Sequence, residues 1–393
     1  MTDRASGHGP IMHPAQSPPL RVAHLISGLQ IGGAETMLAR LVTSLDPARV
    51  ETIVISVSEP GPIGDYLESQ GVQVVALGLR QGVPDVRTPF RVVRLLRRWR
   101  ADLLQTWLYH ADIVGGMAGW ASRIPVVWNV RQTDLSPRTT RLITRVAAHA
   151  AAQWSSWLAR AIVCVSYATR DAHAAIGYDA AKMEVIPNGF DLDVCKPDDA
   201  ARRTVRREFG LPASATLVGH VGRYDPAKDH ATMLRAAAAL PPSVHVMMVG
   251  TGVTPDNREL AAMRSALGLE QRVHLIGPRS DVPRLTAAFD VAVSSSISEG
   301  FSNAIGEAMA CGVPCVVTDV GDSARIVGDT GRVVQAGDAA QLAGAIGDLL
   351  ALPEAQRQRL GRRARERIED RYGLDVITAR YVALWRRVCA VAH

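Results

Sequence analysis

The chain has 393 residues, of which 47% are hydrophobic and 21% are charged. Its length exceeds that of one hydrophobic core and predicts two domains, while the composition excludes a globally disordered protein. The net charge of +6 is modest and neither half of the chain is strongly basic, so we do not expect nucleic acid as a partner.

Five cysteines are scattered along the chain: Cys164, Cys195, Cys311, Cys315 and Cys389. They are too few for a disulfide framework, and no neighbouring His or Cys pair completes a zinc site, so we expect free buried thiols in a reducing cytosol. Residues 1–18 lack an apolar core and are expected to form a disordered tail, not a signal peptide. No apolar run approaches the roughly 20 residues of a membrane-spanning helix.

Short apolar runs alternate with helical patterns from residue 21 onward. The run at 21–27 leads through three glycines into a helical pattern at 35–45, which is the opening of a βαβ unit. Further strands are predicted at 50–57, 72–77, 103–106, 126–129 and 162–166. This alternation is typical of a parallel sheet covered by helices on both faces.

The alternation breaks at residues 186–199, which are rich in Pro, Asn, Gly and Asp, and restarts after a short helix at 202–209. Later strands are predicted at 217–221, 244–249, 273–276, 291–294 and 315–318. We therefore expect an α/β protein with Rossmann-like parallel-sheet domains over 19–196 and 197–373. A last helix, at 374–393, is expected to pack back on the first domain.

Three segments lie where open α/β sheets bind ligands, beyond the carboxyl ends of strands. The first, residues 28–35, has glycines at 28, 32 and 33, which do not match the G-x-G-x-x-G of dinucleotide enzymes, so a dehydrogenase is not expected. Gly32 and Gly33 form a tight turn or, at the mouth of a cleft, let the backbone approach a phosphate or a sugar.

The second segment, residues 222–228, carries Arg223 and Lys228 directly after a predicted strand. Two cations at the end of a strand suit a diphosphate, whose growing negative charge must be neutralised as it leaves. The alternative is an ordinary solvated loop.

The third segment, residues 294–312, places Glu299 in the loop after a strand and Glu307 about one turn inside a helix that begins near Ser302. Both carboxylates, and the free amides between them, would surround one pocket at the helix N-terminus. A predicted strand, a glycine, a predicted helix and helix-stop residues follow one another in the order that such a pocket requires. The spacing of the two glutamates is therefore not expected to be a coincidence.

In this order the three segments resemble glycosyltransferase family 4, the retaining enzymes of the GT-B fold found in bacterial cell-surface polysaccharide assembly. Glu299 and Glu307 resemble the E-x7-E element of that family. Arg223 and Lys228 resemble its phosphate-binding pair. Other motifs in register are Gly32–Gly33, 165–166, 186–191 and Gly250 with Gly252. The resemblance covers nearly the whole chain after residue 20.

The resemblance implies two Rossmann-like domains facing across a cleft, with the acceptor on the N-terminal side and a nucleotide-diphosphate-sugar on the C-terminal side. Glu307 would hold the ribose and Glu299 the donor hexose, with Arg223 and Lys228 on the diphosphate. The further donor-binding residues would be Gly32, Gly33, Gly250, Gly252, Arg279, Gly300, Phe301, Ser302 and Asn303. No metal and no cofactor beyond this co-substrate is expected, because no DxD-like acidic pair follows a strand.

One departure from the family pattern concerns the acceptor side. Many members carry a His after the strand that 126–129 matches, whereas this chain has Asn129 to Asp134 there without any His. Arg131 and His110 are therefore both candidates for the residue that faces the acceptor, and neither is preferred.

Residues 87–100 hold six arginines and no acid, interleaved with large apolar residues. Such a helix suits anionic lipid, which would fit a lipid-linked acceptor and a cytoplasmic protein on the inner face of the plasma membrane. The alternative is an ordinary surface helix. The expected acceptor is either a glycan or a lipid-linked one.

Two rival functions remain open at this point. One is a nucleotide-sugar epimerase or phosphorylase on the same fold, and the other is a non-catalytic subunit that binds a nucleotide-sugar. The base, the hexose and the acceptor are not assigned by the sequence.

Overall fold

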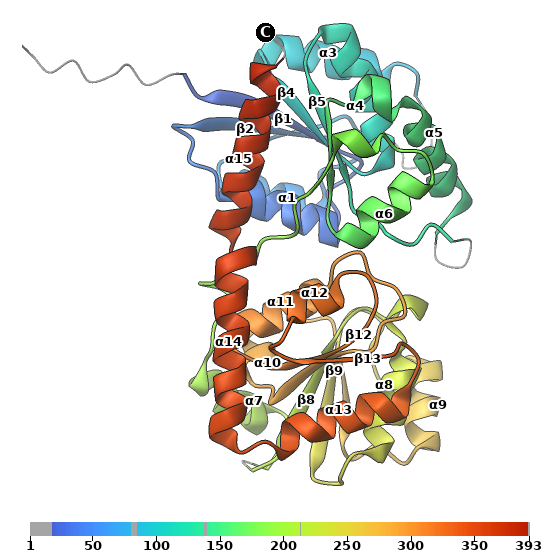
Figure 1. The fold of residues 1–393 in the computed structure, drawn as a ribbon, viewed down its shortest axis with the longest axis vertical. Coiled ribbons are helices and arrows are strands. Elements are labelled where there is room, and N and C mark those ends of the chain that lie inside the picture. Colours follow the sequence, from blue (N-terminus) through green and yellow to red (C-terminus); the bar gives the residue numbers. More distant parts are fainter. Residues whose placement is uncertain (1–17, 80–84, 137–139, 213, 392–393) are drawn as a thin grey trace, which may run out of the picture.

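The computed structural model describes residues 18–79, 85–136, 140–212 and 214–391, so the predicted tail lies outside the described residues apart from its last residue. Two α/β bodies are stacked along the long axis of the molecule (Figure 1). Within the described parts, no helix is long and apolar enough to cross a membrane. The five cysteines are free thiols, and four of them are buried.

The N-terminal domain is built on a seven-stranded parallel sheet in the order β3-β2-β1-β4-β5-β6-β7. Its strands are β1 Leu20–Ile26, β2 Val50–Ser56, β3 Gln73–Ala76, β4 Leu103–Trp107, β5 Val126–Val130, β6 Ala161–Cys164 and β7 Met183–Val185. Its helices are α1 Gly33–Thr43, α2 Gly61–Ser69, α3 Thr88–Trp99, α4 Tyr109–Ser122, α5 Leu142–Leu158, α6 Tyr167–Ala175 and the 3-10 turn η1 Ala180–Lys182. Helices cover both faces of the sheet, as the continuous apolar strands require.

The C-terminal domain repeats this plan with a six-stranded parallel sheet in the order β10-β9-β8-β11-β12-β13. Its strands are β8 Thr216–Val221, β9 Val244–Val249, β10 Val273–Gly277, β11 Val291–Ser294, β12 Cys315–Thr318 and β13 Arg332–Val334. Its helices are α7 Asp199–Glu208, η2 Pro226–Lys228, α8 His230–Ala239, α9 Arg258–Ala266, α10 Val282–Ala287, α11 Asn303–Ala310, α12 Ser323–Val327, α13 Ala339–Ala351 and α14 Glu354–Tyr372. The predicted fold class is confirmed.

The chain crosses between the domains twice. After α14 it returns as α15, Leu374–Ala390, which runs along the N-terminal sheet on the side of the molecule that α14 also occupies (Figure 1). Tyr381 and Trp385 of α15 are fully buried against that sheet, and the Trp385 indole donates to Gln105 Oε1 at 2.9 Å. The two crossings are joined where the Phe190 amide donates to the Tyr372 carbonyl at 2.9 Å.

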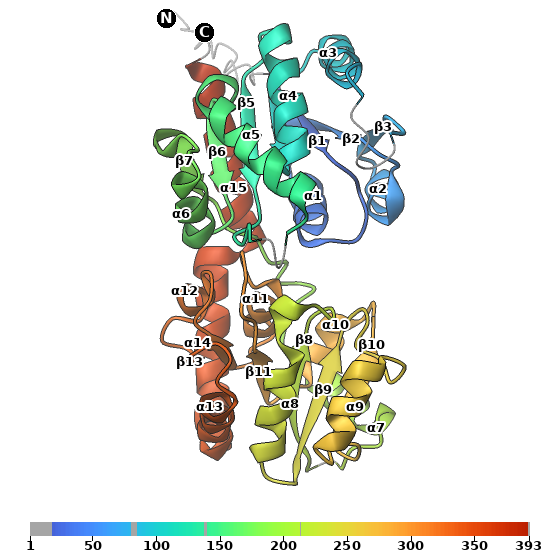
Figure 2. The same ribbon diagram turned by 90° about the vertical axis from the view of Figure 1, so that its right-hand side faces the viewer.

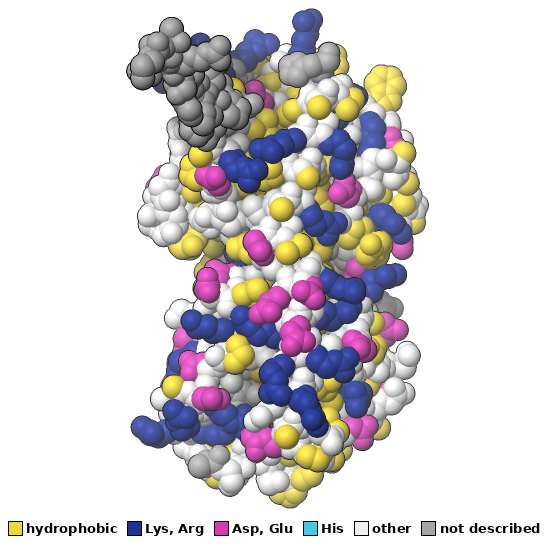
Figure 3. Space-filling view, turned by 60° about the vertical axis from the view of Figure 1, so that its left-hand side comes forward, with side chains coloured by type: hydrophobic (Ala, Val, Ile, Leu, Met, Phe, Trp, Pro, Cys, Tyr) yellow, Lys and Arg dark blue, Asp and Glu magenta, His cyan; other side chains and the backbone are white. Residues whose placement is uncertain are grey.

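The strand orders point to the place of a ligand site. In each sheet the order reverses beside one central strand, at β1 with β4 and at β8 with β11. Ligands of open parallel sheets bind at such switch points, beyond the carboxyl ends of the strands. The loops after β1 and β8 both lead toward the junction of the domains, which appears as a narrow waist in Figure 3, where Lys and Arg side chains are interspersed with Asp and Glu.

Candidate active site

Lys228 and Glu299 form an ion pair at the C-terminal side of the domain junction. The carboxylate of Asp225 accepts from the amide of Ala227 and shapes the short turn η2, from which Lys228 extends. Its Nζ lies 2.5 Å from Glu299 Oε1, and the Ser296 hydroxyl donates to the same oxygen at 2.7 Å. Because β8 and β11 are neighbours, the loops that follow them bring these two predicted catalytic residues together.

The structure does not bring the other two predicted cations to this ion pair. The Arg223 side chain is 71% exposed and is paired with Asp225 at 3.0 Å. Arg279 is paired with Asp281 at 2.7 Å and with Glu208 on α7 at 3.1 Å. The hydrogen bonds from Arg279 and Arg284 hold the pKa of Asp281 well below its ordinary value. Lys228 is therefore the cation that stands at Glu299.

The two glycines of the G-x-G motif lie in the loop that follows β9, where it packs against the loop that follows β8. Gly250 has a φ of +156°, and a Cβ there would collide with the carbonyl oxygen of Gly222. Gly252 has a φ of +76° and packs against Tyr224, whose amide donates to the Thr251 carbonyl at 2.7 Å. The glycines thus let two backbone segments approach each other beside Lys228.

The N-terminus of α11 lies between the two predicted carboxylates. Ser302 is its buried N-cap residue, and no side chain among the described residues caps the helix there. The ring of Phe301 stacks on Phe190 at 6.1 Å between centroids and belongs to the core, so only its backbone remains for a ligand. Asn303 accepts at its Oδ1 from Asn188, across the domain junction, at 2.6 Å.

The glycines of the two domains lie where the domains come closest. A Cβ on Gly33, the first residue of α1, would be 3.5 Å from Asn303 Nδ2. A Cβ on Gly300 would be 2.8 Å from the carbonyl oxygen of Arg131. Gly32 is the N-cap residue of α1, and a Cβ there would collide with the carboxylate of Glu35. A side chain at Gly300 would therefore push the domains apart, whereas one at Gly32 would displace the Glu35 carboxylate and one at Gly33 would make an ordinary contact with Asn303.

Of the two acceptor-side candidates, Arg131 is the one that the structure places at this junction. Its guanidinium donates to Asn188 and to Asn129 Oδ1, the latter at 3.3 Å, and lies 5.1 Å from the centre of the Trp107 ring. Burial lowers the pKa of Arg131. Because Asn188 also donates to Asn303, Arg131 is connected to the start of α11. His110 is exposed in the first turn of α4.

Two cross-domain contacts were missed at the level of sequence. Arg40 of α1 is paired with Glu307 of α11 at 2.7 Å, which is the one ion pair between the domains within the described residues. Asp322, in the loop before α12, accepts from the amides of Tyr167 and Ala168 at 2.9 and 3.1 Å and so caps α6 of the other domain. Neither pair has a sequence signal, because each depends on how the domains meet.

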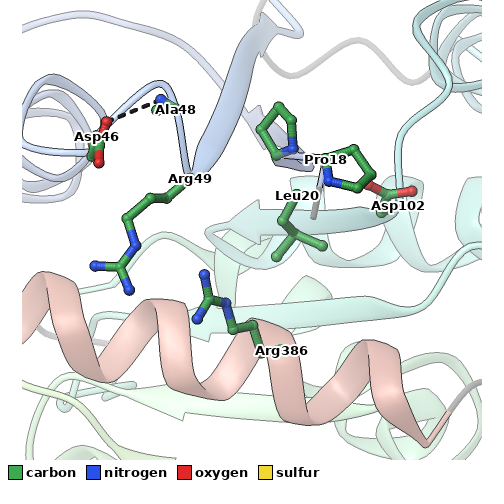
Figure 4. Close-up of a pocket in the computed structure, with 8 residues that line it drawn as sticks. Pro18, Leu20, Asp46, Ala48, Arg49, Asp102 and Arg386 are labelled. Atoms are coloured by element: carbon green, nitrogen blue, oxygen red, sulfur yellow. Dashed lines mark hydrogen bonds between the residues drawn. The ribbon is translucent and has the colours of Figure 1, made fainter. Parts of the chain in front are cut away.

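Two hollows in the described part of the chain do not enclose the Lys228–Glu299 pair. One of about 770 Å³ is lined by Leu20, Arg49, Asp102 and Arg386, at the amino ends of the N-terminal strands (Figure 4). It is at the wrong edge of the sheet for a ligand site of this fold. The other, of about 500 Å³, lies between the domains beside α14 and includes Tyr167 and Arg325 among its lining residues.

Both domains match known protein families. Residues 31–194 match the model described as Glycosyltransferase Family 4, and residues 215–352 match the model described as Glycosyl transferases group 1. D-inositol 3-phosphate glycosyltransferase of Mycobacterium tuberculosis is 35% identical over 237 residues, which are 58% of this chain and 48% of that protein. The chain thus spans about half the length of the curated relatives that it matches.

Solved structures are similar over nearly the whole chain. HepE of Anabaena in complex with UDP is 26% identical and superposes with a TM-score of 0.82 over 94% of this chain and 100% of its own. A glycosyltransferase of Rickettsia africae, 15% identical, superposes with a TM-score of 0.81 over 94% of this chain and 98% of its own, which is a likeness of fold alone. The predicted GT-B arrangement is confirmed.

Proposed function

Because the chain belongs to the family 4 glycosyltransferases, we propose that it transfers a hexose, with retention and without a metal ion, from a UDP-sugar to an acceptor. The observation that carries the proposal is the Lys228–Glu299 ion pair, which stands at the carboxyl ends of adjacent strands. HepE has been solved with UDP and with UDP-glucose, which supports uracil as the base and glucose as the first sugar to test.

Each charged group at the junction has a task that suits its chemistry. Lys228 neutralises the diphosphate, whose negative charge grows as the glycosidic bond breaks, and this charge is why no metal ion is needed. Glu299 keeps one carboxylate oxygen for hexose hydroxyls while the other is held by Lys228 and Ser296. Glu307 takes the ribose. The amides of residues 300–303, at the N-terminus of α11, meet the anionic part of the donor.

The acceptor is proposed to be lipid-linked, and the enzyme to work on the cytoplasmic face of a membrane. The support is α3, where Arg91, Arg94 and Arg98 are exposed together with Phe90. A basic helix with an exposed aromatic ring suits the anionic cytoplasmic leaflet. Retention of configuration rests on the family resemblance.

The proposal is tested by binding and by donor turnover. UDP and UDP-glucose should raise the melting temperature more than GDP, ADP and their sugars do, because a ligand that binds only the folded state stabilises it by mass action. UDP release from UDP-glucose should be slow without acceptor and accelerate with a lipid-linked acceptor. Rapid UDP release without acceptor would favour an epimerase instead, and binding without any turnover would favour a non-catalytic subunit.

Transfer activity is expected to survive EDTA, because Lys228 supplies positive charge where metal-using transferases place a cation. The measurement is donor consumption with acceptor, after chelation and again after adding Mg²⁺ or Mn²⁺. Loss of activity on chelation, with full rescue by the metal ion, would contradict metal independence.

Replacing Arg40 with methionine is expected to weaken UDP binding about three- to tenfold, because Arg40 fixes the carboxylate of Glu307 on which the ribose is proposed to bind. Titration calorimetry with UDP measures the effect. Arg49→Met is the matched control, since Arg49 is exposed in the same domain. Equal affinities in the wild type and both variants would show that the Arg40–Glu307 pair does not position the ribose site.

A further inference from the structure

The 17-residue helix α5 buries small residues and exposes large apolar ones, which is the reverse of the usual arrangement. Its buried face consists of small residues: Ala147, Ala148, Ala151, Ala152 and Ser155. Its exposed face carries large apolar ones, with Leu142 72%, Val146 59% and Trp157 87% exposed. A surface helix normally turns its large apolar side chains inward and leaves polar ones in water. α5 therefore presents to solvent the kind of surface that proteins usually bury.

Close helix packing explains the small residues but not the large ones. Gly116 of α4 lies against α5, where a Cβ would come within 2.9 Å of Leu158 Cβ, so small side chains are needed on the inner side. Nothing in that packing requires tryptophan on the outer side. The neighbouring helix α4 carries a further exposed ring, Trp120, at 76%, and exposed apolar patches mark interaction sites.

The charge around this surface is mostly positive, and Asp179, whose amide donates to Ser155 of α5, is itself paired with Lys182. Between Asp134 and Asp171 the sequence holds five arginines and no acid, and residues 87–100 hold six arginines and no acid. The helices α3, α4 and α5 pack side by side along one face of the N-terminal sheet, which Figure 2 shows from the front. A bilayer with anionic headgroups matches an apolar strip flanked by arginines, whereas a second copy of the chain would bring like charges together.

We propose that the outer face of α5, with Ile143, Val146, Trp154 and Trp157 at its centre, enters the headgroup region of an anionic bilayer. Tryptophan prefers this region because its ring is apolar and its N–H is polar. This deepens the proposed action on a lipid-linked acceptor, and the sequence had pointed only to 87–100. Gln132, the neighbour of Arg131, donates to the hydroxyl of Thr140, two residues before α5, so the lipid-facing strip starts near the domain junction and would bring a membrane-borne acceptor to the cleft.

Vesicle binding tests the proposal without any transfer reaction. The full chain is sedimented with vesicles of phosphatidylcholine alone and of phosphatidylcholine mixed with phosphatidylglycerol. We expect binding to the mixed vesicles that falls at least about fivefold in Trp157→Ser and further in Val146→Ser/Trp157→Ser, because each change removes apolar area from the bilayer. Val194→Ser, a change of an exposed valine near α7, is the control and should bind like the wild type.

The outcomes separate this inference from the proposed function. Binding of Trp157→Ser equal to that of the wild type, or no binding of the wild type to anionic vesicles, would overturn the inference. A wild-type dimer that Trp157→Ser converts to a monomer, measured by light scattering, would make the face a protein interface and overturn it as well. UDP affinity should be the same in all variants. A failure to bind UDP with intact vesicle binding would overturn only the proposed donor.

Discussion

Replacing Lys228 with alanine is expected to lower kcat about 10²- to 10³-fold, the effect of removing one preorganised charge from a developing anion. The loss should fall on turnover more than on donor affinity, because the charge on the diphosphate is greater in the transition state than in the bound donor. The measurement is UDP release from UDP-glucose at saturating donor, with the UDP-glucose affinity measured separately by calorimetry.

Stability must be measured for the same variant. Glu299 is only 9% exposed, so Lys228→Ala leaves a buried carboxylate that accepts only from Ser296 among the described residues, and this change is expected to lower the melting temperature. Arg223→Ala is the matched control: that guanidinium is exposed and paired with Asp225, so its loss should reduce kcat less. A Lys228→Ala variant with full kcat and weakened affinity would make Lys228 a binding residue only.

The longer strands of both sheets could be predicted because each is a buried apolar run between turn residues. β7 and β13 were missed for a physical reason, since each has three residues at the edge of its sheet and is too short for a pattern. The proximity of the loops after β8 and β11 could be predicted from the sequence, because the loops that follow parallel strands lie at the same edge of the sheet. Lys228 and Glu299 meet in this way.

The features that could not be predicted from the sequence depend on how the two domains pack together and on which face of a helix is buried. Nothing in the sequence distinguishes Arg40 from other arginines, because its ion pair with Glu307 forms only where α1 and α11 meet. The choice between Arg131 and His110 likewise needed the position of Asn188 in the connection between the domains. α5 escaped notice because its apolar residues would ordinarily be assigned to the core, whereas its alanines fill that place.

Replacing Glu307 with alanine is expected to weaken UDP binding about 10- to 100-fold, because a charged hydrogen bond is worth about 1.5–3 kcal/mol and the ribose would lose its acceptor. Calorimetry with UDP and 2′-deoxy-UDP separates this contact from a general loss of the site. The wild type should prefer UDP, and the variant should bind the two nucleotides almost equally.

The comparison of the two nucleotides is needed because Glu307→Ala also breaks the ion pair with Arg40, which lies 2.7 Å from Glu307 and whose side chain is 23% exposed. Loss of that ion pair alone could weaken UDP binding. A purely structural role of Glu307 would weaken the binding of both nucleotides alike through the altered domain contact and would leave the preference for UDP intact. A Glu307→Ala variant that still discriminates between UDP and 2′-deoxy-UDP as the wild type does would therefore refute ribose recognition by Glu307, whatever its absolute affinity.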